Sequence, residues 1–112
     1  MIEAYDFGQI TIDGCRYSRD VIIFPGNVKD NWWRREGHKL SLEDLKDVFE
    51  AEPEVLVIGT GYSGLMKVPQ EVEDYVKSRN IELVVENTRH ACRTYNRLCQ
   101  SRKVVAAFHL TC

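Results

Sequence analysis

Three glycines after an apolar run give this chain its clearest resemblance to a ligand-binding motif. Residues 55–64 read Val-Leu-Val-Ile-Gly-Thr-Gly-Tyr-Ser-Gly, with no charged side chain. After a strand, the spacing G-x-G-x-x-G is typical of dinucleotide binding, because the glycines let the backbone approach a pyrophosphate at a helix N-terminus. An acid at the end of the next strand, Glu86, could then reach a ribose hydroxyl.

Two observations argue against a dinucleotide at this turn. Pro69 is a favourable first residue for the next helix, so that helix begins too far beyond Gly64 to meet a pyrophosphate. Only one strand–helix–strand unit follows the turn, whereas a dinucleotide fold has two such halves. We therefore expect no cofactor, and we interpret the turn as structural, with a small anion nest of exposed N–H groups as the open alternative. The candidate binding residues here are Gly59, Thr60, Gly61 and Tyr62.

A second candidate site is the sequence Trp32-Trp33-Arg34-Arg35, which lies in a stretch without regular pattern from 26 to 40. Neighbouring side chains of an extended segment point to opposite sides, so one tryptophan should enter the core and the other should face solvent or a partner. Trp and Arg are enriched among interface hot spots, which makes Trp33 and Arg34 candidate partner-binding residues. A nucleic-acid platform is disfavoured by the net charge of −2 and by the nearby acids Asp30 and Glu36.

The histidines and cysteines form no recognisable catalytic or metal-binding set. Their spacings match no standard zinc pattern, and we expect neither a metal nor catalytic residues. We interpret His109 as a hydrogen-bonded strand histidine and keep it as a candidate binding residue. The four cysteines contain no C-x-x-C pair and are expected to be free thiols, with a disulfide from Cys112 to Cys92 or to Cys99 as the alternative.

The bulk properties indicate one domain spanning 1–112 in the cytoplasm. The chain has 112 residues, 15 basic and 17 acidic side chains, and a hydrophobic share of 44%. No field of one sign favours nucleic acid or anionic lipid. No apolar run approaches the ~20 residues that span a bilayer, and the first residues lack the features of a secretory signal.

The hydrophobic pattern predicts a β-hairpin followed by alternating strands and helices. Asp13-Gly14 is a strong hairpin turn between strands at 7–12 and 17–24. Helices are predicted from Ser41 to Pro53, from Pro69 to Asn80 and over 89–100, the last with a solvated basic stripe of arginines. Strands at 55–58, 81–85 and 104–110 complete an α/β core with right-handed crossovers.

Several of these segments, taken in order, resemble a known family of small single-domain proteins. Its founding structure came from a methane-producing archaeon, and its animal relatives include an adipogenesis-associated protein and an assembly factor for mitochondrial respiratory complex I. The resemblance implies a three-layer α/β fold with a central mixed sheet of about five strands, the last antiparallel, and an added N-terminal β-hairpin. It implies action through protein partners and no established reaction. The segments that carry the resemblance are the hairpin, Trp33-Arg34, Gly37-His38, Leu56 to Gly61, Tyr95-Asn96 and Phe108 to Cys112.

Two functional hypotheses follow. The first is a non-enzymatic protein-interaction or assembly module, active as a monomer or a weak homodimer, without nucleic acid or membrane. The second is a protein, or a minor enzyme, that binds a small molecule or an anion such as a nucleotide or phosphate at the glycine turn 59–64.

Overall fold

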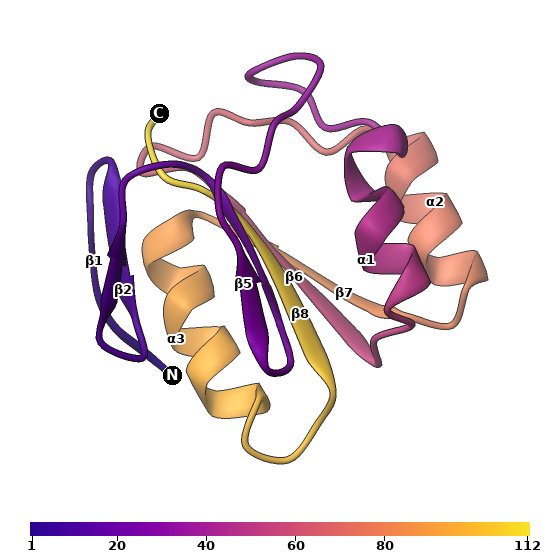
Figure 1. The fold of residues 1–112 in the computed structure, drawn as a ribbon. Coiled ribbons are helices and arrows are strands. Elements are labelled where there is room, and N and C mark those ends of the chain that lie inside the picture. Colours follow the sequence, from indigo (N-terminus) through magenta and orange to yellow (C-terminus); the bar gives the residue numbers. More distant parts are fainter.

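The computed structural model describes residues 1–112 and contains two β-sheets and three α-helices (Figure 1). A small antiparallel sheet has the order β1-β2-β3, and a larger mixed sheet has the order β5-β4-β8-β6-β7. The strands are β1 (Ile2–Asp6), β2 (Gln9–Ile12), β3 (Cys15–Tyr17), β4 (Val21–Phe24), β5 (Asn27–Lys29), β6 (Val55–Thr60), β7 (Glu82–Glu86) and β8 (Val104–His109). The helices are α1 (Lys46–Glu50), preceded by a 3₁₀ turn η1 (Glu43–Leu45), α2 (Gln70–Ser78) and α3 (Thr88–Leu98).

The five-stranded sheet is covered on both faces, which explains why β6 and β8 are apolar up to their last residues, Thr60 and His109. Helix α3 and the small sheet cover one face, and α1 and α2 cover the other (Figure 1). Side chains alternate between the faces of a strand, so Val55 and Val57 pack toward α3 while Leu56 and Ile58 pack toward α1 and α2. All six residues of β6 are buried, and so are all six of β8. The predicted three-layer α/β fold with a mixed sheet is confirmed.

The last strand lies in the middle of the larger sheet, between β4 and β6. It runs antiparallel to β4, with Val21 opposite Phe108, and parallel to β6, with Val55 opposite Val104. The expected antiparallel last strand is therefore right for one neighbour and wrong for the other. Two crossovers explain the parallel pairing: the chain leaves β6, returns through α2 to β7, and then returns through α3 to β8 on the opposite side of β6.

The N-terminal β element differs from the predicted hairpin in both strands. Residues 7–8, predicted to begin the first strand, form the turn between β1 and β2, and β1 is an additional strand that was not predicted. Asp13-Gly14 forms the expected turn, and Ile12 pairs with Cys15, but the return strand ends at Tyr17. Residues 21–24 form β4 of the larger sheet instead. The physical reason is that Val21 and Ile22 are both fully buried, which requires cover on two faces.

The predicted starts of the second and third helices agree with the structure within one residue. The first helix, predicted from Ser41 to Pro53, is shorter: a 3₁₀ turn occupies Glu43–Leu45 and α1 spans only Lys46–Glu50. Pro69 was predicted to be the first helical residue, but it is the N-cap of α2. The helix therefore begins at Gln70, six residues after Gly64. The Asn87 side chain caps α3 by accepting a hydrogen bond from the backbone N–H of His90 at 3.0 Å. No helix of the chain combines the length and apolar composition that crossing a bilayer requires.

Candidate functional site

The glycine turn lies at the carboxyl ends of the three parallel strands β6, β7 and β8. In an open α/β sheet, ligands bind where two neighbouring strands send their crossover helices to opposite faces. In this chain, α2 follows β6 on one face and α3 follows β7 on the opposite face, so that crevice opens between β6 and β7. Gly61 lies directly after β6, at the mouth of the crevice.

The chain's own last residues, which follow β8, pack against the glycine turn. Gly61 has φ +111°, and a Cβ atom added there would lie 2.5 Å from the carbonyl carbon of Cys112. The Tyr62 N–H donates to the Thr111 oxygen at 2.7 Å, and the Leu65 N–H donates to the Cys112 oxygen at 3.1 Å. These N–H groups are thereby engaged within the protein, which is the structural role of such a turn.

The Thr88 hydroxyl ties the turn to the end of β8. Its Oγ1 accepts from the Gly61 N–H at 2.9 Å and donates to the His109 carbonyl oxygen at 2.6 Å. Gly59 packs against the same side chain, since an added Cβ would lie 2.8 Å from Thr88 Oγ1. The hydroxyl of Thr60 donates to the Glu86 backbone oxygen at 3.1 Å. The structure thus places Gly59, Thr60 and Gly61 in one hydrogen-bonded junction, in which Thr88 is a member that the sequence did not indicate.

A buried charged network lies beside this junction and joins Asp20, Arg34 and His109. Asp20 Oδ2 accepts from Arg34 Nη1 at 2.7 Å and lies 2.8 Å from His109 Nδ1. Asp20 Oδ1 accepts from the Leu110 N–H at 2.7 Å, and Arg34 Nη2 donates to the Gly37 oxygen at 3.1 Å. Only 5% of the Arg34 side chain and 7% of the His109 side chain are exposed. Two of the predicted site residues, Arg34 and His109, therefore meet at a third residue, Asp20.

The carboxyl group of Asp20 is held in its charged form. Burial alone would raise its pKa, but hydrogen bonds from His109, from the Leu110 backbone and from Arg34 outweigh burial and hold the pKa below its usual value. The Arg34 guanidinium also lies over the Trp32 ring, 4.8 Å from its centroid. The network thus fixes the start of the Trp-Arg segment against the end of β8.

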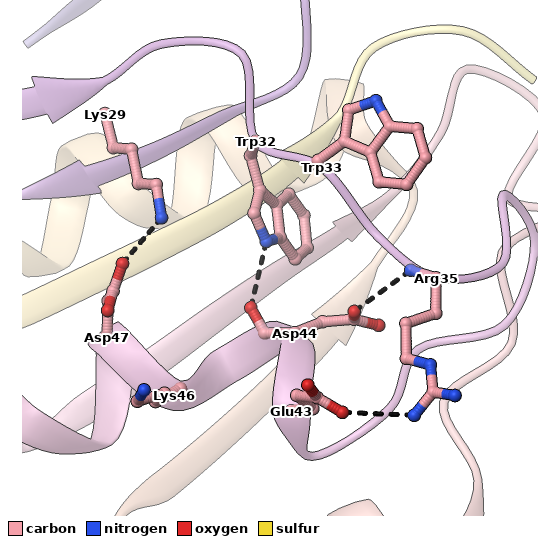
Figure 2. Close-up of a pocket in the computed structure, with 8 residues that line it drawn as sticks. All are labelled: Lys29, Trp32, Trp33, Arg35, Glu43, Asp44, Lys46 and Asp47. Carbon is pink, nitrogen blue, oxygen red and sulfur yellow. Dashed lines mark hydrogen bonds and ion pairs between the residues drawn. The ribbon is translucent and has the colours of Figure 1, made fainter.

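The two tryptophans point in different directions, as predicted (Figure 2). Trp32 is buried, and its indole N–H donates to the Asp44 backbone oxygen at 3.0 Å. Trp33 is 80% exposed, the largest exposed fraction among the chain's large apolar side chains. Both line a shallow polar hollow of about 290 Å³ that is bordered by the ion pairs Lys29–Asp47 and Arg35–Glu43.

The remaining predicted site residues lie elsewhere. Tyr62 is exposed beyond the glycine turn, on the side of α3 and the small sheet, and its ring packs against Phe7. All four cysteines are free thiols, so the structure forms neither of the considered disulfides from Cys112. Burial raises the pKa of the Cys92 thiol to about 12, which makes it a core residue rather than a nucleophile.

Comparison with known protein families identifies the family of this chain. A family model described as "Protein of unknown function (DUF498/DUF598)" matches residues 2–109. The chain belongs to this family. The resemblance inferred from the sequence is thereby confirmed, and the family's description assigns no reaction to its members.

Relatives and solved structures of the same family support the fold. The rat protein "NADH dehydrogenase [ubiquinone] 1 alpha subcomplex assembly factor 3" is 28% identical over 109 residues, which cover 95% of this chain and 57% of that protein. The chain thus spans little more than half the length of this relative. The conserved hypothetical protein PH1505 from Pyrococcus horikoshii OT3 is 28% identical and superimposes with a TM-score of 0.86, covering 100% of this chain and 99% of the other. The structure of MT938 is 26% identical with a TM-score of 0.83, covering 100% and 98%.

Proposed function

We propose that this chain is a non-enzymatic protein-interaction module that acts in the assembly of protein complexes, with Trp33 as an anchor for a protein partner. The observation that carries the proposal is a large aromatic side chain that is 80% exposed between two fixed neighbours. The names of the chain's relatives as assembly factors for NADH dehydrogenase support a role through partners. Because the chain spans only part of those proteins, its partner is defined here by chemistry, as a protein with an apolar pocket.

The rigidity of the segment supports this role. The backbone N–H of Trp32 donates to the Asp20 oxygen at 2.7 Å, and Arg34 is bound to the same residue through its side chain. Trp33 is therefore held in place from both sides, and a partner would lose little backbone entropy on binding it. The surrounding ion pairs resemble the polar rim that borders a hot spot.

The test is the change Trp33→Ala in a quantitative affinity enrichment from lysate of the native host. We expect the abundance of at least one specific partner to fall about tenfold or more, because a hot-spot tryptophan contributes about 2 kcal/mol or more. The control is Val85→Ala, which removes apolar surface from an exposed residue on β7. Equal recovery of every partner by Trp33→Ala and wild type, with the fold intact by circular dichroism, would contradict the proposal.

Nucleotide or phosphate binding at the glycine turn receives less support, because the N–H groups of Gly61, Tyr62 and Leu65 already have partners in the chain. A thermal-shift measurement with millimolar ATP, NAD and inorganic phosphate tests it. We expect no shift, whereas a ligand at 100 times its dissociation constant would stabilise the fold by about 2.7 kcal/mol. A cytoplasmic location and a monomeric or weakly dimeric state stay predictions.

A further inference from the structure

The exposed face of α3 carries a row of three arginines that no carboxylate neutralises. Arg89, Arg93 and Arg97 follow one another at four-residue spacing and are all exposed. None of them forms an ion pair within the chain, whose arginine ion pairs all involve other residues. Like charges at this spacing destabilise a helix, and a cation in the first turn opposes the helix dipole. The row therefore lowers the stability of α3 unless something outside the chain compensates it.

An exposed aromatic cluster lies at the beginning of this row. The Arg89 guanidinium lies 5.4 Å from the ring centroid of Tyr62 and 6.0 Å from that of Tyr5. Phe7, in the turn between β1 and β2, meets Tyr62 edge to face at 5.7 Å. Phe7 is 53% exposed and Tyr62 is 45% exposed, and Leu65 in the same loop as Tyr62 is also exposed. Apolar and cationic groups from three separate segments thus adjoin on one surface.

Two hollows flank the arginine row. One of about 240 Å³ lies between β1 and α3, and one of about 300 Å³ lies between α3 and the end of β7; Arg93 lines both. The carboxylates bordering these hollows are already hydrogen-bonded: Glu3 accepts from the Gly14 N–H at 2.9 Å, and Glu86 accepts from the Thr94 hydroxyl at 2.6 Å. Neither carboxylate forms an ion pair with the row, so the arginines can receive carboxylates from another molecule.

We propose that this face binds an acidic segment of a protein partner, with carboxylates on Arg89, Arg93 and Arg97 and an apolar side chain on Phe7 and Tyr62. Four residues of helix rise about 6.0 Å, and alternate residues of an extended strand are about 6.7 Å apart, so a segment with an acid at every second position matches the row. Peptide is favoured over nucleic acid because a nucleic-acid footprint needs a broad basic face, whereas the cations here form a single row bordered by Glu3 and Glu86. The face lies on the opposite side of the sheet from Trp32 and its segment, so the inference does not depend on the role of Trp33.

The test is fluorescence anisotropy with a fluorescein-labelled peptide that begins Trp-Gly and continues with alternating Glu and Ser over ten residues. Its control peptide has Gln in place of each Glu. The triple change Arg89→Gln, Arg93→Gln and Arg97→Gln should weaken binding of the acidic peptide about tenfold, the sum of three pairs of about 0.5 kcal/mol. A charge-matched triple change of the exposed cations Arg19, Lys46 and Lys77 to Gln should alter the dissociation constant less than twofold.

Further measurements test the aromatic contact and the arginine row separately. Phe7→Ser should weaken binding of the Trp-Gly peptide at least threefold and leave binding of a Ser-Gly version unchanged. Trp33→Ala should change the binding of neither peptide. The triple arginine variant should also melt no lower than wild type, because its substitutions relieve repulsion within α3. Three results would each overturn the proposal. The first is equal weakening of peptide binding by the two triple changes, and the second is equal affinity for the Glu and Gln peptides. The third is tighter binding of a twelve-nucleotide oligo-dT that the triple arginine variant loses.

Discussion

The buried carboxylate of Asp20 offers the sharpest test of the structure, through the change Asp20→Asn. In the variant, the amide oxygen can still accept from the Leu110 N–H, so that hydrogen bond survives. The amide NH₂ then faces the Arg34 guanidinium, donor against donor, where a charge-assisted bond of 2.7 Å existed. The substitution therefore isolates the loss of negative charge beside a buried arginine.

The expected loss of unfolding free energy is about 3 kcal/mol. Removing one partner of a buried ion pair costs about 3–5 kcal/mol, because the other charge is left without compensation. The lower end applies here, since 17% of the Asp20 side chain is exposed to water while only 5% of Arg34 is. Adding Arg34→Met to Asp20→Asn removes the stranded charge, and the double variant should regain about 1.5 kcal/mol.

Urea unfolding followed by the fluorescence of the buried Trp32 measures these differences, with unchanged slopes as the check on two-state behaviour. The control is Asp47→Asn, whose ion pair with Lys29 is exposed and should contribute no more than about 1 kcal/mol. A loss below about 0.5 kcal/mol in Asp20→Asn, or strict additivity of Asp20→Asn with Arg34→Met, would refute the assignment of a coupled buried pair.

The same network predicts how stability depends on pH. The pKa of Asp20 is lower in the folded chain than in the unfolded chain, so the folded state favours the charged carboxylate. Its contribution is fully present above the usual carboxyl pKa of about 3.9 and is lost as pH falls through the lower folded value. The stability difference between wild type and Asp20→Asn should therefore be constant from pH 5 to 7 and shrink in acid. A difference that grows on acidification would reverse the sign and contradict this reasoning.

Two other predictions concern the glycine turn and the thiols. Gly61→Ala should destabilise the fold by about 2 kcal/mol or more in the same urea assay, because its φ is +111° and the new Cβ would meet the Cys112 backbone. Gly14→Ala, at φ +83° with open space around it, should cost only about 1 kcal/mol, and equal losses would mean that residues 111–112 do not pack against the turn. Iodoacetamide at pH 8 should alkylate the exposed Cys15 first and Cys92 last, because burial raises the pKa of Cys92 to about 12. Mass spectrometry of the digested protein gives the order, and comparable rates at the two residues would argue against the core described here.

The parts of the fold that depend on local sequence were predictable. Apolar runs predicted β6 and β8, and the predicted start of the last helix, at residue 89, lies one residue from the start of α3. The assignment of Val21–Phe24 failed because its partner strand lies more than eighty residues away, in β8, and hydrophobic pattern alone does not identify a partner. The orientation of β8 relative to β6 likewise depends on where a crossover ends, which no single segment encodes.

In the candidate site, too, local features were predictable from the sequence and long-range contacts were not. Side chains alternate in an extended chain, so the sequence alone predicted that Trp32 and Trp33 would face different environments. Trp32 is buried and Trp33 is exposed. Asp20 was missed because its partners lie 14, 89 and 90 residues away in the chain. An acid immediately before a largely buried strand was the available signal, since such a residue needs a compensating partner once its neighbours are covered.

The central position of β8 has a consequence for how the chain reaches its fold during synthesis. Both β4 and β6 pair with residues 104–109, which leave the ribosome after every other strand. Until then, two strongly apolar strands have exposed hydrogen-bonding edges, the condition under which chains aggregate or recruit chaperones. The larger sheet therefore closes only after translation has passed residue 109, and its sequence-distant pairings slow folding relative to a helical protein of the same size.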